Sequence, residues 1–299
     1  MESPQASSSR EAPRKPWVAF ILGLLGPGAG QIYSGEPTRG VWFFLLSSAV
    51  GVASVLFFLK FPYAPLNIIA PVLFSVAVGL YILVDALRAA RRQSFDYKLQ
   101  PFNRWYVYVI LILASSAVLS IIKNVIARAY VIPAGSMMPT LQIGDKLLVD
   151  ELSYGVRDPT RRVCLALCGN PRRGDVIVSI FPEDRTKDFV KRVIAVGGDT
   201  VEIRNKKVYI DGQTVYDPHA FFDAEDSAEK IPIQDNYGPK KVPADHVFVL
   251  GDNRNKSYDS RFWGFVDLAD VKGKAAVIYW SWDADARIIR LERIGKAIE

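Results

Sequence analysis

The stretch Tyr130-Val131-Ile132-Pro133-Ala134-Gly135-Ser136-Met137-Met138-Pro139-Thr140-Leu141 follows a long apolar run that ends near Ala127. Two prolines bracket a short loop, and each biases the residue before it toward extended geometry. Gly135 allows the backbone to bend tightly just before Ser136. The stretch thus presents one hydroxyl on a constrained loop where the chain leaves a membrane. We therefore expect Ser136 to be a nucleophile that acts on something the bilayer presents.

The chain divides at this stretch into two parts of different composition. It has 299 residues, 50% of them hydrophobic, and the long apolar runs lie before the stretch. This length allows a membrane portion and one soluble domain. The formal charge is +6, but the basic residues gather at the ends of apolar segments, which is typical of the cytoplasmic side of a membrane. Without a groove-reading motif we expect no nucleic-acid partner. Two cysteines and two histidines are too few to predict a metal site, and no cofactor is expected.

The sequence before the stretch predicts a multi-pass membrane module. Residues 1–16 are rich in Ser, Pro and charge, which predicts a disordered cytoplasmic tail. Residues 17–104 predict a re-entrant or short helix over Trp17–Tyr33, interrupted by Gly and Pro, and two spanning helices over Gly40–Leu59 and Leu66–Leu87. Residues 105–127 predict a transmembrane anchor. The basic loop between the last two spans is expected in the cytoplasm. Four full spans with an exported N-terminus is the competing topology.

Residues 128–299 are expected outside the cytoplasm as a mostly antiparallel β domain. Short runs rich in Val, Ile and aromatic residues alternate with turn residues, without a helical pattern between them. Asn205-Lys206 fits a tight hairpin turn. Gln213–Pro243 lacks periodicity and is expected to be a looped excursion. The predicted strands are Asp145–Glu151, Asp175–Phe181, Phe189–Val196, Thr200–Arg204, Lys207–Asp211, His246–Leu250 and Lys274–Trp282.

A serine nucleophile needs a neighbouring base, and lysine is the better candidate here. Neither His219 nor His246 lies in a recognisable triad setting. In Phe189–Ala195, strand alternation directs Lys191 to the same face as apolar residues, where burial would disfavour its charged form. The alternative is a lysine that reaches solvent from an edge strand. Arg192 points to the other face and could be an ordinary surface cation.

A third stretch, Gly251–Gly264, is dense in polar residues between apolar strands. Such a loop must satisfy its own backbone with side chains, and a well-capped hairpin connection would explain it. Read functionally, Ser257 could hold the lysine amine by a hydrogen bond. Asp259 and Arg261 could form a pair that fixes the loop, and Asn253 could cap the turn.

Together the three stretches resemble the sequence boxes of bacterial type I signal peptidases. The resemblance covers roughly residues 105 to 298 and rests on Ile-Pro-Ala-Gly-Ser-Met-Met-Pro-Thr-Leu, Phe-Val-Lys-Arg-Val-Ile-Ala-Val-Gly-Gly-Asp and Gly-Asp-Asn-Arg-x-x-Ser-x-Asp-Ser-Arg-Phe-Trp-Gly, in that order. It implies a signal peptidase-like β fold with Ser136 as nucleophile and Lys191 as general base. Ser257, Asp259, Arg261, Arg192 and Asn253 would support the site.

The resemblance also implies a substrate, a location and partners. The enzyme would be a membrane-bound endopeptidase of the bacterial cytoplasmic (inner) membrane, with an extracytoplasmic catalytic domain that cuts the signal peptides of exported preproteins after small residues. The lipid bilayer and the protein translocation machinery are the other candidate partners. Shallow pockets would be lined by Tyr130, Ile132, Met137, Leu141 and Val190, unless these residues only pack in the core. The family often has a serine where this chain has Ala134, so the oxyanion would depend on backbone N–H groups.

Two questions stay open at this level. Cys164 and Cys168 could form a disulfide outside the cytoplasm, or serve a structural or lipid-facing role without one. The rival function is a membrane-tethered, non-catalytic β module that binds exported chains. A self-cleaving Ser–Lys regulator would need a scissile bond in its own chain and a DNA-binding unit, and neither is visible.

Overall fold

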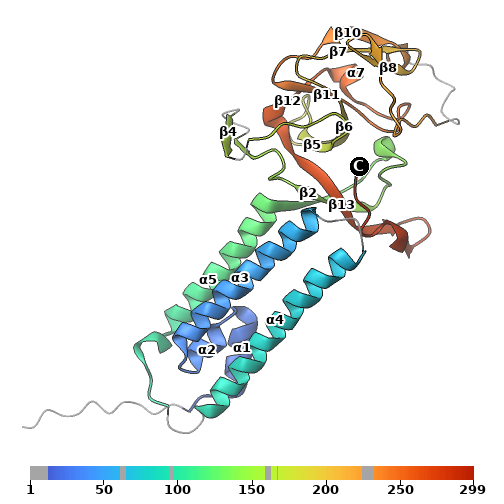
Figure 1. Cartoon of the computed structure of the whole chain (residues 1–299). Helices are drawn as coiled ribbons and strands as arrows, with labels where there is room; N and C mark the ends of the chain where they lie inside the picture. The colour runs from blue at the N-terminus through green and yellow to red at the C-terminus, as the bar shows by residue number, and fades with distance from the viewer. Residues whose placement is uncertain (1–12, 61–64, 94–96, 159–162, 167, 224–231) are drawn as a thin grey trace, which may run out of the picture. The chain divides into compact units, whose positions relative to one another are not determined.

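The computed structural model describes residues 13–60, 65–93, 97–158, 163–166, 168–223 and 232–299. Contacts divide the chain into a helical unit that ends at Asn124 and a β-rich unit from Val125 onward (Figure 1). The predicted fold class, N-terminal helices followed by a mostly antiparallel β domain, is confirmed. The two units are described separately below.

The helical unit contains two helices that are long and apolar enough to cross a membrane. These candidate spans are Pro37–Leu59 and Ile69–Arg92, with mean hydropathies of 2.2 and 2.1, and they overlap the two predicted spans. The helices are α1 (Pro16–Leu25), α2 (Ala29–Tyr33), α3 (Pro37–Lys60), α4 (Pro65–Arg92) and α5 (Trp105–Ile121), with a 3-10 turn η1 (Pro101–Asn103) before α5.

The segment predicted as one re-entrant or short helix is divided into α1 and α2. Gly28, between them, has a φ of +87°, and a Cβ there would lie 1.9 Å from the carbonyl oxygen of Gly40. A Cβ on Gly30 would lie 2.4 Å from the carbonyl oxygen of Ala19. Glycine is therefore required for this close approach of α1, α2 and α3.

The α-helix in the segment predicted as an anchor, residues 105–127, is shorter than the segment. α5 ends at Ile121 and is followed by a π-helical turn, η2 (Ile122–Ile126). Ala127 already belongs to strand β1 (Ala127–Val131). Ile126 at the end of η2 and Ala127 at the start of β1 are both apolar and buried, so the residue types do not mark the change. Hydrophobicity alone therefore does not locate the end of the helix.

The β unit is built around an eight-stranded sheet with the order β1-β2-β13-β5-β6-β11-β12, in which β14 pairs with β13. The paired neighbours are antiparallel. Besides β1, its strands are β2 (Asp145–Asp150), β5 (Val176–Ile180), β6 (Asp188–Val196), β11 (His246–Leu250), β12 (Val266–Asp267), β13 (Val271–Asp283) and β14 (Ile288–Ile289). Lys191 lies on β6, between β5 and β11.

A second, four-stranded sheet has the order β10-β7-β8-β9. Its strands are β7 (Thr200–Arg204), β8 (Lys207–Ile210), β9 (Gln213–Thr214) and β10 (Tyr237–Lys241), and a separate pair is formed by β3 (Val156–Asp158) and β4 (Val163–Ala166). Asn205 and Lys206 both have positive φ values, 49° and 68°, as the predicted hairpin turn requires.

The prediction of one looped excursion over Gln213–Pro243 is wrong, apart from residues 224–231, which lie outside the described part. The segment contributes β9, β10 and the short helix α6 (Pro232–Asp235). β10 pairs with β7 with an irregular register, and Pro239 lies within it. Tyr237 is its one fully buried side chain, so the strand shows no period-two pattern.

Candidate active site

The loop that carries Ser136, the predicted nucleophile, is called the nucleophile loop here, and it is closed at its base by strands β1 and β2. Ile132 N donates to the carbonyl of Asp145 at 2.9 Å, and Gly144 N donates to the carbonyl of Ile132 at 3.0 Å. Within the loop, a 3-10 turn η3 (Gly135–Met137) carries Ser136. The carbonyl oxygen of Ser136 accepts a hydrogen bond from Asn253 N at 3.1 Å. The serine backbone is therefore held from both the sheet and the polar loop after β11.

Ser136 and Lys191 form a direct hydrogen bond. The Lys191 Nζ atom lies 2.8 Å from Ser136 Oγ, although the two residues come from different elements. Lys191 is 4% exposed, so the alternative of a lysine that reaches solvent is wrong. This separation is within the range over which a base can take a hydroxyl proton.

Burial lowers the pKa of Lys191 from 10.5 to about 8. Removal of the amine from water is the largest cause, because it disfavours the ammonium. The negative charges of Asp259 and Asp252 act in the opposite direction and raise the pKa, but to a smaller extent. A substantial fraction of the lysine is therefore neutral in mildly alkaline solution and can accept a proton.

Arg192 is buried, not an ordinary surface cation. It is 1% exposed and forms a two-pronged ion pair with Asp252, with N···O distances of 2.7 and 2.8 Å. Its Nη1 atom also donates to the carbonyl oxygens of Gly174 and Glu299. The guanidinium is buried because these acceptors satisfy it on the side of β6 opposite to Lys191.

A second buried ion pair lies in the polar loop. Asp259 accepts two hydrogen bonds of 2.8 Å from the Arg261 guanidinium and one from Gly251 N at 3.1 Å. Arg261 also donates to the carbonyl of Arg254. The expected pairing of Asp259 with Arg261 is therefore present in the fold.

The two other polar residues expected in this loop differ in their contacts. Asn253 Oδ1 accepts from Lys256 N at 3.3 Å, which is the expected turn-capping contact. Ser257 Oγ is buried and has no hydrogen-bond partner among the described residues, so the expected bond to Lys191 is not formed. Instead it packs against Gly251, where a Cβ would lie only 2.3 Å from it.

A cavity of about 320 Å³ opens beside the Ser136–Lys191 pair. Four of the five residues expected to line substrate pockets contribute to it: Tyr130, Ile132, Met137 and Val190. Leu141 does not, because it is fully buried and packs in the core with Leu147 and Val149. Ala134, Phe189 and Tyr258 complete much of the wall. The cavity is shallow and mostly apolar, and the hydroxyl and the amine lie in its wall.

Comparison with known proteins identifies the family of the chain. The family model described as "Signal peptidase, peptidase S26" matches residues 103–280, more than half of the chain. The chain belongs to this family. It is therefore a peptidase, a hydrolase of the serine protease class.

Three relatives named as signal peptidases each match between about half and two thirds of this chain. A signal peptidase I of Leptolyngbya laminosa is 38% identical over 53% of this chain and 71% of its own length. A probable signal peptidase I-2 of Synechocystis is 36% identical over 64% of this chain and 80% of its own length. The signal peptidase I of Bacillus caldolyticus is 33% identical over 60% and 90%.

Sequence reasoning missed several residues that hold this signal peptidase-like site together. Asp252 binds Arg192 and also accepts a hydrogen bond from Thr140 Oγ1 at 2.6 Å. Thr140 is held from its other side by Arg293, which donates to its carbonyl at 2.9 Å and pairs with Asp145 at 2.5 Å. The loop after the nucleophile is thus held between two buried ion pairs. Asp252 and Arg254 lie close together in the sequence with opposite charges, and the sequence does not indicate which ion-pair partner each one has.

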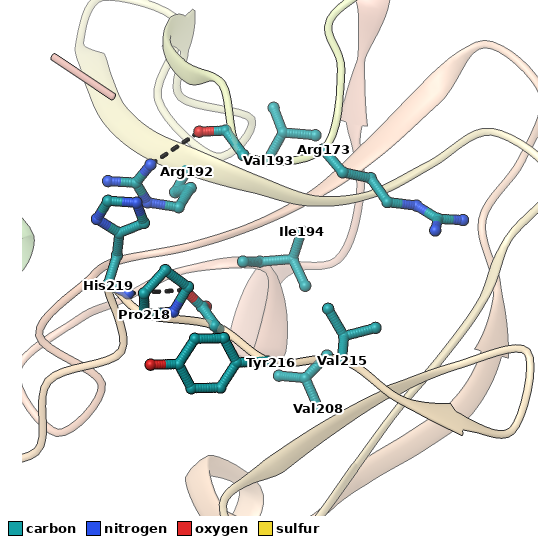
Figure 2. Close-up of a pocket in the computed structure, with 11 residues that line it drawn as sticks. Arg173, Arg192, Val193, Ile194, Val208, Val215, Tyr216, Pro218 and His219 are labelled. Atoms are coloured by element: carbon teal, nitrogen blue, oxygen red, sulfur yellow. Dashed lines mark hydrogen bonds between the residues drawn. The ribbon is translucent and has the colours of Figure 1, made fainter.

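The opposite side of β6 also borders a cavity of about 320 Å³ (Figure 2). Arg192 and His219 line it together with apolar residues that include Val208 and Val215. His219 is therefore placed away from the Ser136–Lys191 pair. Cys168 is disulfide-bonded, which decides the open question in favour of a disulfide. The side chain of the only other cysteine, Cys164, lies outside the described part.

We predict that Asp252→Asn lowers the thermal unfolding temperature by on the order of 10 °C. The substitution leaves the Arg192 guanidinium buried without a counter-charge, which costs roughly 3–5 kcal/mol. The control is Asp184→Asn, which breaks the exposed pair with Lys187 and should change little. Unfolding followed by tryptophan fluorescence measures both. Equal shifts in the two variants would contradict a structural role for the buried pair.

Proposed function

We propose that this protein is a membrane-bound signal peptidase that removes signal peptides from exported preproteins with a Ser136–Lys191 dyad. The observation that carries the proposal is the 2.8 Å contact between Lys191 Nζ and Ser136 Oγ, formed by a buried amine. Family membership supports the reaction class, and the relatives named above are signal peptidases. A Ser–Lys pair is a known variant of the serine protease triad.

The reaction begins with neutral Lys191. As Ser136 Oγ attacks the carbonyl carbon of the scissile bond, its proton passes to Lys191 Nζ. The tetrahedral oxyanion would be stabilised by backbone N–H groups, chiefly that of Ser136, because Ala134 offers no hydroxyl. The resulting ammonium donates its proton to the leaving amine, which departs as the N-terminus of the mature protein. Water then loses a proton to Lys191 as it attacks the ester carbonyl. When the ester C–O bond breaks, Lys191 returns that proton to Ser136 Oγ, which restores Ser136 and releases the signal peptide.

The cavity suits an extended chain with small side chains near the cut. Tyr130, Ile132, Met137 and Val190 form apolar walls next to Ser136, which suit small apolar side chains beside the cut. The precursor would lie extended beside β6, so that every second side chain of the precursor points into the cavity. Ser257, Asp259, Arg261, Arg192 and Asn253 would support the site by fixing the polar loop and the strand.

We place the enzyme in the bacterial cytoplasmic membrane as a multi-pass protein. α3 and α4 carry the candidate spans, and the basic residues between Arg88 and Arg104 favour the cytoplasmic side for their connection to α5. α5 and η2 together cover Trp105–Ile126 and would return the chain to the other side. The catalytic unit would then face outward, where the bilayer and the translocation machinery present a precursor.

The test is cleavage of a precursor by detergent-solubilised protein. We expect the full-length protein to release a signal peptide after a small residue and Ser136→Ala to release none, because the nucleophile is gone. Ser153→Ala is the matched control, since that serine lies on an exposed loop and bonds only Asp150 among the described residues. If Ser136→Ala cleaved the precursor as fast as the unmodified protein, the proposed dyad would be wrong. Binding of the precursor without cleavage by any of the three would favour a non-catalytic β module.

A further inference from the structure

The helical unit carries a polar cluster that the peptidase reaction does not use. Arg14 and the two rings beside it, Tyr33 and Tyr97, lie before the segment that matches the signal peptidase family, which begins at residue 103. Arg14 is at the centre of the cluster, just before α1. Its backbone N–H donates to the carbonyl of Gln93 at 3.4 Å, directly after the last residue of α4. The cluster therefore lies at the end of a candidate membrane span.

The Arg14 guanidinium is enclosed between two aromatic rings. Its Cζ atom lies 4.5 Å from the ring centre of Tyr33 and 4.2 Å from that of Tyr97. The residue is 6% exposed, and its Nε and Nη2 atoms have no hydrogen-bond partner among the described residues. A buried cation without an anion costs several kcal/mol, and cation–π contacts offset only part of that.

The groups around Arg14 bond to one another and not to its guanidinium. Tyr97 OH donates to Asn103 Oδ1 at 2.6 Å, and Asn103 Nδ2 donates to Tyr108 OH at 3.3 Å. The Tyr33 hydroxyl accepts from Lys15 N at 3.2 Å. No carboxylate of a described residue pairs with Arg14, because Glu36 and Asp85 both bind Arg39. The described side chains thus form a cage around a cation and leave its charge uncompensated.

The exposed charges of the described residues at the end of α4 and just after it have the same sign as Arg14. Arg91 and Arg92 end α4, and both are exposed, as is Lys98 shortly after them. Clusters of basic residues at the ends of spanning helices attract anionic lipid headgroups, at about 1 kcal/mol for each cation near the surface. A guanidinium matches the oxygens of a phosphate group in a two-pronged geometry.

We propose that Arg14 binds the phosphate group of an anionic membrane lipid at this end of the helical unit. The unpaired Nε and Nη2 donors of Arg14 are covered by neighbouring atoms in the free protein, and they would take the phosphate oxygens once the headgroup enters beside the two tyrosine rings. The exposed cations at the end of α4 would add attraction. The inference depends on the membrane location proposed above and not on the dyad. The ligand is a lipid headgroup because Arg14 lies where the candidate span Ile69–Arg92 ends, which is the depth of headgroups.

The test is native mass spectrometry of the full-length protein in detergent, titrated with phosphatidylglycerol or phosphatidylcholine. We expect one tightly bound phosphatidylglycerol and weaker binding of phosphatidylcholine. Arg14→Gln should raise the apparent Kd for phosphatidylglycerol by about 10- to 100-fold, because two charge-assisted hydrogen bonds are lost. Arg14→Lys keeps the positive charge but loses the two-pronged geometry of the guanidinium. Its Kd should lie between those of the unmodified protein and Arg14→Gln. Lys98→Gln, an exposed cation of the same region, should change the Kd by at most about fivefold.

The possible results distinguish this lipid-binding inference from the proposed membrane location and from the proposed Ser136–Lys191 dyad. Equal effects of Arg14→Gln and Lys98→Gln, or equal binding of the two lipids, would overturn it. Competition by millimolar inorganic phosphate that requires Arg14 would support the same site with free phosphate as a ligand. A protein that stays in solution without detergent and binds neither lipid would refute the membrane location itself. Cleavage of a soluble peptide should be the same in all four proteins, so failure of the dyad proposal would be seen separately.

Discussion

Lys191→Met is expected to lower kcat/KM for precursor cleavage by about 10⁴-fold or more, while the folded protein becomes more stable at neutral pH. Loss of activity follows from loss of the only base within hydrogen-bond distance of Ser136 Oγ among the described residues. The gain in stability follows from the lowered pKa of Lys191, about 8 in the folded state against 10.5 for an ordinary lysine. Methionine has a similar length and no charge to bury.

The direction of the stability effect can be derived from proton binding. Because the folded state binds the lysine proton less tightly than the unfolded state, stability rises as pH increases through about 8 toward 10.5. Below about pH 8 the folded protein carries the full cost of a buried ammonium, roughly 3 kcal/mol. Lys191→Met removes that cost but also removes the hydrogen bond to Ser136, worth about 1 kcal/mol. We therefore expect a net gain of about 1–3 kcal/mol at pH 7.

The control for this prediction is Lys207→Met, which replaces an exposed lysine on β8 and should alter neither activity nor stability appreciably. Thermal unfolding at pH 7 and at pH 10.5 would measure the pH dependence of both variants. A Lys191→Met protein that is less stable than the parent at pH 7 would show that the lysine is not a strained catalytic group. Such a result would favour an ordinary structural role.

Gly251→Ala is expected to lower kcat by about 100-fold although the side chain gains only one methyl group. The new Cβ would lie 2.4 Å from the carbonyl oxygen of Ser136 and 2.3 Å from Ser257 Oγ. Rotation of the Ser257 side chain would move its Oγ but not its Cβ, which would lie 2.5 Å from the new atom. The Ser136 carbonyl belongs to the nucleophile loop, and that loop must move with it. A displacement of about 1 Å at a reacting group can cost about 100-fold in rate.

Overpacking at this position should also cost about 1–3 kcal/mol of stability. Gly79→Ala is the matched control, because a Cβ there has no atom within 4 Å and alanine favours the helix. Rates measured at saturating precursor separate kcat from KM for the two variants. Activity of Gly251→Ala equal to that of the parent would mean that the loop tolerates the shift. The close contact between Gly251 and the nucleophile loop would then be irrelevant to catalysis.

The sequence predicted the strands of the β unit where side chains alternate or where apolar runs are bounded by turns. Thr200–Arg204 and His246–Leu250 agree with the observed bounds at both ends. β1 was missed because apolar residues resume at Val125 after only two polar residues, Lys123 and Asn124, so the run was read as one helix as far as Ala127. Local pattern cannot separate a helix from a strand when both are apolar.

The proposed nucleophile and base, Ser136 and Lys191, could be brought together from the sequence because each lies on one element with a local signal. Gly135 and the two prolines define the serine loop, and strand alternation at Lys191 indicates a buried amine. Contacts between elements could not be predicted in the same way. The pairing of Arg192 with Asp252 depends on the register between β6 and β11, and Arg293 reaches Asp145 from the far end of the chain. Ser257 was misassigned because only the packing against Gly251 shows where its hydroxyl goes.

The account depends most directly on the titration of one amine, and the pH dependence of kcat/KM for precursor cleavage measures it. With substrate well below KM, we expect activity to rise with pH along a limb with an apparent pKa near 8, as Lys191 loses its proton. The control variant Lys207→Met should show the same rise of activity with pH as the unmodified protein. A limb near or above 10, or activity that is flat from pH 5 to about 9, would contradict a buried, neutral lysine as the base for Ser136.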